Sequence, residues 1–325
     1  MNYCSNIAFT WVVNLCLCCT LNLQAQVIKD NVFKFKSEGN PVIEHKFTAD
    51  PAAFVEGDTL WLFTGHDYEG NQKGYKMKDW CVFSTTDLKN WTEYPTPLKV
   101  SDFTWDKTGK AYAGQAIKRN GKYYWYISTD GSGIGVAVAD KPQGPYKDAI
   151  GKPLLTNADC FASTHNWTCI DPAVFVDNNG QAWLFWGNGV CYYAKLKSNM
   201  VEIDGKVNKI DFAGFKFEEA PWVHKYKDNY YLSYASGLPE KTAYAIAKNV
   251  NGPYVYKEIL NEVAGNSGTN HQAIVEFKGK WYFIYHNGTL ERNGNSFSRS
   301  VCIDQLHYNK DGSIKRVEMT TEGIK

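Results

Sequence analysis

The sequence predicts an all-β protein folded as a five-bladed β-propeller. One apolar strand pattern occurs five times, each copy follows a short turn rich in Gly, Asp, Asn or Lys, and no long amphipathic helix pattern is evident. Successive copies begin roughly 48 to 63 residues apart, which is the period of propeller blades rather than of helical solenoids. The five copies are residues 60–65, 123–128, 182–187, 230–235 and 281–286.

Each copy is the second strand of a predicted blade. Residues 169–187 contain the whole unit: an Asp-Pro step, an apolar run, a turn with Asn and Gly, and a second apolar run. This order is typical of a β-hairpin with an acid at its entrance. Residues 49–65 repeat it imperfectly, and segments such as 82–91 and 243–247 are suited to the third and fourth strands. We therefore expect one propeller domain over residues 26–325; a β-helix, the rival architecture, has much shorter repeats.

The first 25 residues are predicted to be a secretory signal. Residues 7–23 are almost wholly apolar or small and uncharged, and Ala25 is the small residue that a signal peptidase prefers before its cleavage site. We expect cleavage before Gln26 and a secreted or periplasmic protein with no stable membrane span. A retained membrane anchor is the alternative, because no Lys or Arg precedes the apolar run.

The cysteines beyond this signal do not indicate a metal site. Five of the nine cysteines remain, an odd number, and they lack the C-x-x-C spacing of metal ligands. We expect buried free thiols, with one disulfide as the alternative in an oxidising compartment. These residues are Cys81, Cys160, Cys169, Cys191 and Cys302.

The composition argues against a nucleic-acid partner and suits a carbohydrate ligand. The formal net charge is +1 and no basic cluster is present, whereas phosphate binding relies on a basic surface. Aromatic residues are abundant, with 21 Tyr, 17 Phe and 11 Trp, and their faces can stack on neutral sugars. The alternative explanation for these rings is a large buried core.

Aligning the five predicted hairpins places several acids at one level of the propeller. The innermost strands line the central channel, so equivalent positions at their starts face one cavity. Asp50, Asp171, Glu219 and His271 fall at that position, together with the region of residues 113–115 from the second copy. A single Asp before Pro is often a turn residue that satisfies local amides. Three acids at equivalent positions point instead to a functional site.

Three carboxylates in one apolar cleft indicate acid–base chemistry. Each acid lies among apolar neighbours, where an unpaired carboxylate would be costly. Crowding pushes the pKa values of such groups apart, so that one site holds both an acid and a base near neutral pH. Hydrolysis of a glycosidic bond requires that combination.

The segments that carry these residues resemble glycoside hydrolase family 43. The resemblance also rests on residues 268–275, GTNHQAIV, and residues 298–304, SRSVCID, and it extends from about residue 40 to residue 317. It implies a five-bladed propeller with hydrolytic activity and no organic cofactor. Within the family the sequence is most similar to arabinoxylan-debranching arabinofuranosidases and the related xylosidases. The segments indicating this branch are residues 40–50 (NPVIEHKFTAD), 64–67 (TGHD) and 285–288 (YHNG).

The resemblance assigns a role to each acid. It implies that Asp50 is the general base that activates a water and that Glu219 is the general acid that protonates the leaving oxygen. Asp171 would orient Glu219 and raise its pKa. The implied mechanism is inverting, with base and acid about 6.5–9.5 Å apart. Glu218 is the alternative acid, but side chains alternate along a strand, so we expect only one of the two to face the channel.

The resemblance also implies metal and substrate contacts. It places His271 at a central cation, often calcium, held largely through waters, because a hard cation prefers oxygen ligands. A hydrogen-bonded core histidine is the alternative. It implies that Arg299 reaches the sugar, with a surface salt bridge as the alternative.

Further substrate contacts are predicted at His66, in the TGHD segment, and at Trp222, which adjoins the acid strand. Trp105 and Trp167, in long connections, are candidate stacking platforms for sugar rings. Core packing is the alternative role for each tryptophan.

The expected function is that of a secreted exo-glycosidase releasing α-L-arabinofuranose from arabinoxylan or a related hemicellulose. A β-D-xylosidase and an endo-arabinanase of the same family are alternatives. Exo action needs a pocket closed by loops, and the connections at residues 68–80, 101–111 and 157–167 are long enough to build such a wall. A sugar-binding propeller without catalysis is the alternative of another class, since fold does not fix function.

Overall fold

The computed structural model describes residues 32–69, 74–163, 165–213, 216–291 and 294–324. These residues form strands, turns and two short 3-10 helices, η1 (Val100–Asp102) and η2 (Asn157–Asp159), so the all-β prediction is confirmed. Within these ranges, no helical segment has the length and apolar character needed to cross a membrane. The predicted signal, residues 1–25, lies outside the described residues.

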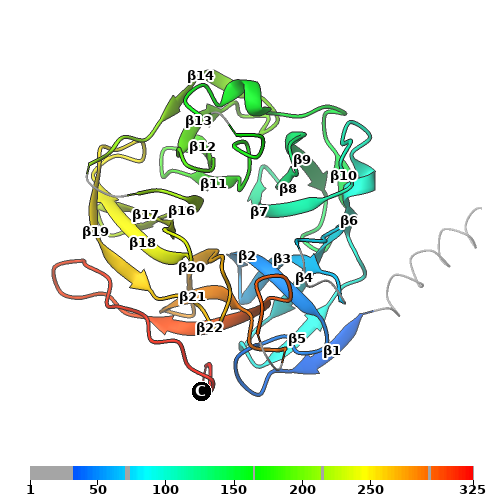
Figure 1. Ribbon diagram of the computed structural model, residues 1–325, viewed down its shortest axis with the longest axis vertical. Helices are drawn as coiled ribbons and strands as arrows, with labels where there is room; N and C mark the ends of the chain where they lie inside the picture. Colours follow the sequence, from blue (N-terminus) through cyan, green and yellow to red (C-terminus); the bar gives the residue numbers. More distant parts are fainter. Residues whose placement is uncertain (1–31, 70–73, 164, 214–215, 292–293, 325) are drawn as a thin grey trace, which may run out of the picture.

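The described strands form five sheets arranged around a central axis, which confirms the five-bladed propeller (Figure 1). Blade 1 contains β1 (Phe33–Lys36), β2 (Phe47–Glu56), β3 (Thr59–Asp67), β4 (Asp79–Thr85), β5 (Asn90–Glu93) and β6 (Leu98–Lys99). Blade 2 contains β7 (Ala111–Arg119), β8 (Lys122–Thr129), β9 (Gly133–Ala139) and β10 (Lys147–Asp148). Blade 3 contains β11 (Ala173–Val176), β12 (Ala182–Trp186), β13 (Tyr192–Leu196) and β14 (Ile203–Lys209).

Blade 4 contains β15 (Phe212–Ala213), β16 (Glu219–Tyr226), β17 (Asn229–Ser236), β18 (Lys241–Ala247) and β19 (Tyr254–Asn261). Blade 5 contains β20 (Gln272–Phe277), β21 (Lys280–Asn287) and β22 (Ser300–Leu306). The five predicted second strands are β3, β8, β12, β17 and β21. In each blade the hairpin of first and second strands is antiparallel, as the turn chemistry predicted.

The turn between β7 and β8 explains how such a hairpin forms. Asn120 and Gly121 both adopt left-handed backbone conformations, with φ of 51° and 75°. Two successive left-handed residues match the twist of a two-residue hairpin, and Asn-Gly is the pair that adopts them at least cost. The register from Gly114↔Ile127 to Arg119↔Lys122 follows directly from this turn.

The core lies between the blades, which explains the continuous apolar runs of the second strands. Every residue of β8 after the first is buried. Trp125 of β8 packs edge to face against Phe63 of blade 1, with ring centroids 4.8 Å apart. A strand covered on both faces needs apolar side chains on both, so its sequence does not alternate.

The propeller is closed by the N-terminal segment lying against the last blade. Within the described residues blade 5 has three strands rather than the expected four, and residues 40–48 run beside β22. The Val42 and Thr48 amides donate hydrogen bonds to the carbonyl oxygens of Val301 and Arg299, at 2.7 and 2.8 Å. The Asn40 side-chain oxygen accepts a 2.8 Å hydrogen bond from the Ile303 amide.

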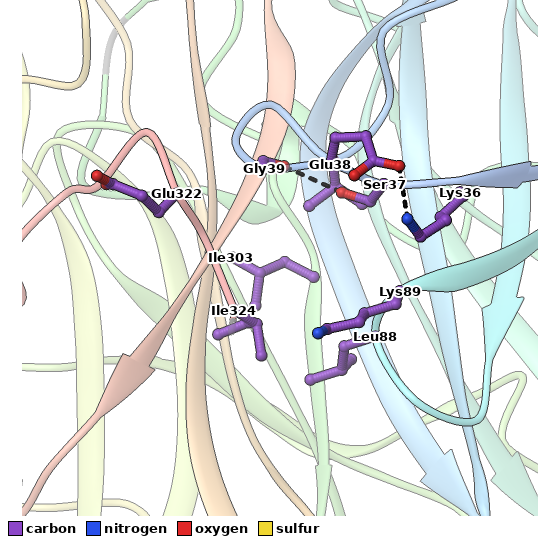
Figure 2. Close-up of a pocket in the computed structure, with 10 residues that line it drawn as sticks. Lys36, Ser37, Glu38, Gly39, Leu88, Lys89, Ile303, Glu322 and Ile324 are labelled. Carbon is purple, nitrogen blue, oxygen red and sulfur yellow. Dashed lines mark hydrogen bonds and ion pairs between the residues drawn. The ribbon is translucent and has the colours of Figure 1, made fainter.

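Figure 2 shows the outer side of this closure, where Ser37, Leu88, Ile303 and Ile324 line a surface pocket. Lys36 and Glu38 form an exposed ion pair at its edge, with Nζ and Oε1 2.7 Å apart. This pocket lies outside the central channel and does not include the predicted acids.

The five cysteines of the described residues are all buried and carry free thiols, as expected.

Candidate active site

The starts of all five innermost strands face one pocket of about 710 Å³ at the end of the channel. Its lining includes Asp50 of β2, Ala113 of β7, Asp171 just before β11, Glu219 of β16 and His271 just before β20. The alignment of the five predicted hairpins is therefore confirmed as a spatial arrangement. Residues separated by more than 200 positions in the sequence share one cavity because the blades repeat around an axis.

An unusual backbone bend aims the acids at this pocket. Asp50, Asp171 and Ala220 each precede a proline and adopt the left-handed conformation, with φ of 50°, 57° and 55°. In β2 and β16 the strand register shifts at this point, as in a β-bulge. Non-glycine residues in this region cost about 1–3 kcal/mol each, and such strain is concentrated at functional sites.

Blade 4 differs from blades 1 and 3 by one residue at this bend. In blades 1 and 3 the left-handed residue is itself the acid, whereas in blade 4 it is Ala220 and the acid Glu219 precedes it. The longer Glu side chain still reaches the same pocket.

Asp50 is a buried carboxylate with a fixed cationic partner. It is 8% exposed, and its Oδ1 accepts a 2.8 Å hydrogen bond from Nη1 of Arg299. Its own amide donates to Nδ1 of His286 at 3.1 Å. Burial raises the pKa of Asp50, and the positive charge and hydrogen bond of Arg299 oppose that rise. Arg299 therefore favours the ionised form that a base requires.

Arg299 is itself held rigidly. Its Nε and Nη2 donate to the two carboxylate oxygens of Asp67 at 2.9 and 3.0 Å, a bidentate pair. The guanidinium lies over the ring of Tyr75, 4.7 Å from its centroid. Arg299 is 3% exposed and lines the pocket, so the alternative of a surface salt bridge does not apply.

Glu219 has the electrostatics of a general acid. Its Oε2 accepts a 2.6 Å hydrogen bond from the side-chain amide of Asn188. Burial raises the pKa of Glu219 to about 7; the Asn188 hydrogen bond lowers it, and the charge of Asp50 raises it. A carboxyl group with such a pKa is about half protonated at pH 7 and can donate its proton.

Asp171 contacts the acid strand through the backbone. Its Oδ2 accepts a 3.0 Å hydrogen bond from the amide of Ala220, the residue after Glu219. Its own amide donates to Oγ of Ser128 at 3.2 Å. Burial raises the pKa of Asp171 well above its usual value, and the charges of Glu219 and Asp50 raise it further.

Glu218 also lines the pocket, contrary to the expectation that only one of the two adjacent glutamates would face it. Strand β16 begins at Glu219, so the alternation that holds within a strand does not extend to Glu218. Glu218 pairs with Lys216, with Oε2 and Nζ 2.8 Å apart. The Lys216 side chain is well exposed, so this pair lies at the rim of the pocket.

His271 faces two of the acids. Its Nδ1 lies 3.9 Å from Oδ1 of Asp50 and 3.8 Å from Oδ2 of Asp171. Burial and the charge of Arg299 together lower the pKa of His271 to about 3, so the imidazole is neutral and has a lone pair to offer. Calcium takes about six to eight oxygen ligands, so these side chains supply a minority of a calcium shell. The donors therefore fit a cation held largely through water.

Two predicted substrate contacts lie outside the pocket. Trp222 is buried between blades 4 and 5, where its indole donates to the carbonyl oxygen of Ile274 at 3.1 Å, because it follows the register shift in β16. His66 points to Asp79, with Nδ1 and Oδ1 2.8 Å apart. Side chains alternate along β3, so the residue next to it, Asp67, faces Arg299 instead.

Two of the three predicted wall connections contribute to the pocket. Tyr75 comes from the connection at residues 68–80, and His165 and Trp167 come from the one at residues 157–167. Trp167 is 49% exposed and stands 5.2 Å from the ring of His165. Trp105 instead is partly buried and packs against the core, and its indole donates to Asp148 at 3.0 Å.

The sequence prediction missed several residues of the site. Asp67 and His286 lie inside the segments TGHD and YHNG, so a signal for them was present. Asn188 and Glu240 follow the second strands of blades 3 and 4, so neither lies at the strand-entry position that the alignment compared. Tyr75 lies in a connection without a repeated pattern.

Comparisons with known proteins match most of the chain to one family. The family model described as glycosyl hydrolases family 43 matches residues 38–314. An arabinoxylan arabinofuranohydrolase of Paenibacillus polymyxa is 31% identical over 90% of this chain, which spans 53% of that protein's length. A xylosidase/arabinosidase of Bacteroides ovatus is 30% identical, and the match covers 87% of this chain and 98% of that protein.

Among solved structures, one match is a β-xylosidase/α-arabinofuranosidase from a compost microbial metagenome, in complex with xylotriose and in a calcium-free form. It superposes with a TM-score of 0.78 at 27% sequence identity, covering 88% of this chain and 98% of that one.

Proposed function

The chain belongs to glycosyl hydrolases family 43, and from this membership we propose that it is an inverting exo-glycosidase that releases α-L-arabinofuranose from arabinoxylan or a related hemicellulose. The observation that carries the proposal is a pair of buried carboxyl groups in one pocket with different hydrogen-bond partners. Asp50 is hydrogen-bonded to a buried arginine, whereas burial raises the pKa of Glu219 to about 7.

Glu219 is the proposed general acid. Cleavage of a glycosidic bond expels an oxygen that needs a proton as the bond breaks. Glu219 holds that proton near neutral pH because its charged form is poorly solvated in the pocket. The Asn188 amide, 2.6 Å from Oε2, fixes the carboxyl orientation and stabilises the charge left after proton transfer.

Asp50 is the proposed general base. A water on the opposite face of the sugar must lose a proton as it attacks the anomeric carbon. Arg299 favours the ionised state of Asp50, and His286 accepts the hydrogen bond of its amide, so the carboxylate is held in position. Attack from the face opposite the leaving group inverts the configuration of the anomeric carbon.

Asp171 is the proposed positioning residue for the acid. Its hydrogen bond to the Ala220 amide fixes the backbone next to Glu219. The charges of Asp171 and Glu219 also interact, so ionisation of one disfavours ionisation of the other.

A calcium ion and export of the protein are also part of the proposal. His271 would hold the ion through a ring nitrogen, with water supplying the other ligands, and the bound ion would add positive charge near the carboxylates. The apolar segment at residues 7–23 supports secretion or transfer to the periplasm.

A β-D-xylosidase is the second candidate. The solved relative named above is a β-xylosidase/α-arabinofuranosidase bound to xylotriose, and the Bacteroides ovatus relative is called a xylosidase/arabinosidase. Both activities use the same acids, and they differ in the sugar that the pocket accepts.

The proposal predicts the products of a simple assay. The full chain is incubated with aryl α-L-arabinofuranoside, aryl β-D-xyloside, arabinoxylan and linear arabinan, and the released sugars and their anomers are followed by NMR. We expect arabinose from the aryl arabinofuranoside and from arabinoxylan, appearing first as the β-anomer. Initial release of the α-anomer would contradict inversion. Release of xylose alone would favour the second candidate, and no release from any substrate would favour a sugar-binding protein.

The pKa of Glu219 predicts the alkaline limb of the pH profile. The acid must be protonated, and its protonated fraction falls as pH rises through about 7, so kcat/KM should fall about tenfold per pH unit above that value. The fall of kcat/KM on the acid side of the profile reflects protonation of Asp50, which must be ionised to act as a base. A 2,4-dinitrophenyl leaving group needs no proton, so with this substrate the alkaline limb should shrink. An unchanged alkaline limb would argue against this assignment of the acid.

A further inference from the structure

Glu240 is a fourth carboxyl group of the pocket, and neither the repeat nor the proposed mechanism accounts for it. It lies in the turn between β17 and β18, is 1% exposed, and lines the same pocket as Glu219. Burying a carboxyl group costs free energy unless its oxygens form hydrogen bonds, so each oxygen of Glu240 is expected to have a partner.

One oxygen and the backbone of Glu240 join blades 4 and 5. The Glu240 amide donates to the carbonyl oxygen of Gly268 at 3.0 Å, and Oε2 accepts from the amide of Asn270 at 2.7 Å. Residues 268–271 carry Thr269 and His271 into the pocket. Glu240 therefore fixes the segment that forms this side of the wall.

The other oxygen has no hydrogen-bond partner in the part of the chain that the structure describes. Among the described residues Oε1 of Glu240 accepts no hydrogen bond, and the side chain borders the cavity. A hydroxyl group of a ligand, or a water that occupies its place, would satisfy Oε1. A sugar has several hydroxyl groups, each of which can both donate and accept a hydrogen bond. Burial also raises the pKa of Glu240 well above its usual value, with the charge of Glu219 raising it further, which favours a neutral group able to donate as well.

We propose that Glu240 is a specificity-determining residue whose Oε1 hydrogen bonds to one hydroxyl group of the bound sugar while Oε2 holds the wall segment in place. This inference rests on the proposed function, since it assumes a sugar in the pocket. Glu240 does not take part in proton transfer. Its role is to reject sugars that lack a hydroxyl group at the matching position, because they would leave a buried oxygen unpaired.

The test compares variants on substrates that each lack one hydroxyl group. The full chain, Glu240→Ala and Glu240→Gln are assayed on aryl α-L-arabinofuranoside and on its 2-, 3- and 5-deoxy analogues. We expect Glu240→Ala to lower kcat/KM on the complete sugar about 10- to 100-fold. On one of the deoxy analogues kcat/KM of the wild-type protein should be lower by a similar factor, and on that analogue Glu240→Ala should lower kcat/KM little further. Glu240→Gln keeps an acceptor and a donor, so it should stay within a few-fold of wild type.

Lys241→Ala is the matched control, because Lys241 adjoins Glu240 but pairs with Glu262 on the surface, 2.7 Å away, and it should behave as wild type. Glu240→Met keeps the side-chain volume and replaces Glu240→Ala if that variant does not fold. Equal losses from the Glu240 substitution on the complete sugar and on all three deoxy analogues would overturn the proposal, as would no loss at all. An inactive wild-type protein would instead refute the proposed function, so the two failures are distinguishable.

Discussion

Glu219→Gln is expected to lower kcat on arabinoxylan about 10³-fold or more. Gln keeps the shape of the side chain and its contact with Asn188, but it cannot donate a proton to the leaving oxygen. Loss of a general acid typically costs about 10²–10⁴-fold. The loss should depend on the leaving group, because an aryl leaving group of low pKa departs without a proton. We therefore expect a much smaller loss on the 2,4-dinitrophenyl arabinofuranoside.

Glu218→Gln is the matched control for this experiment. Glu218 occupies the rim beside Lys216, so its substitution should leave kcat on arabinoxylan within a few-fold of wild type. If Glu218→Gln loses activity and Glu219→Gln keeps it, the assignment of the acid is wrong. Circular dichroism and thermal unfolding of both variants establish that they fold.

Asp50→Asn is expected to lower kcat by about 10³-fold or more on every substrate, regardless of the leaving group. Asn retains an oxygen for the 2.8 Å contact with Arg299 but cannot remove a proton from water. Because the attacking water is common to all substrates, an activated aryl group should not reduce the loss. Whether the loss depends on the leaving group therefore distinguishes the base from the acid in one set of measurements.

Added azide provides a second measurement on Asp50→Asn. Azide is a nucleophile that needs no base, so it should restore part of the turnover and give a glycosyl azide of inverted configuration, detected by NMR. The control is Asp87→Asn, which changes an acid in an exposed turn of blade 1 and should act as wild type. A loss for Asp50→Asn that appears only with poor leaving groups would contradict its role as the base.

Most of the fold was predictable because the second strands leave a strong signal. Strands such as β8 and β12 are buried on both faces, so their apolar runs are continuous and recur with the blade period. The closure was not predictable from local pattern. Residues 40–48 contact the last blade over a separation of more than 250 residues, and the contacts combine backbone hydrogen bonds with single side chains, such as Asn40, that follow no repeated pattern.

The site was predictable where it follows the repeat and not elsewhere. Asp50 and Asp171 occupy equivalent entry positions, so alignment brought them together. Trp222 was misplaced because a register shift separates it from Glu219, and no sequence feature marks the direction of a side chain after such a shift. Glu240 escaped notice because it occurs once, in a turn, and its burial depends on contacts with blade 5.

The closure between residues 40–48 and β22 has a consequence during biosynthesis. Asp50 and Arg299, 249 positions apart in the sequence, are brought together by that closure, with Oδ1 and Nη1 at 2.8 Å. A ribosome must therefore add nearly the whole chain before Asp50, the proposed base, acquires its cationic partner. A nascent chain with four finished blades would hold Asp50, Asp171 and Glu219 but lack Arg299, so hydrolytic competence would report on completion of the last blade.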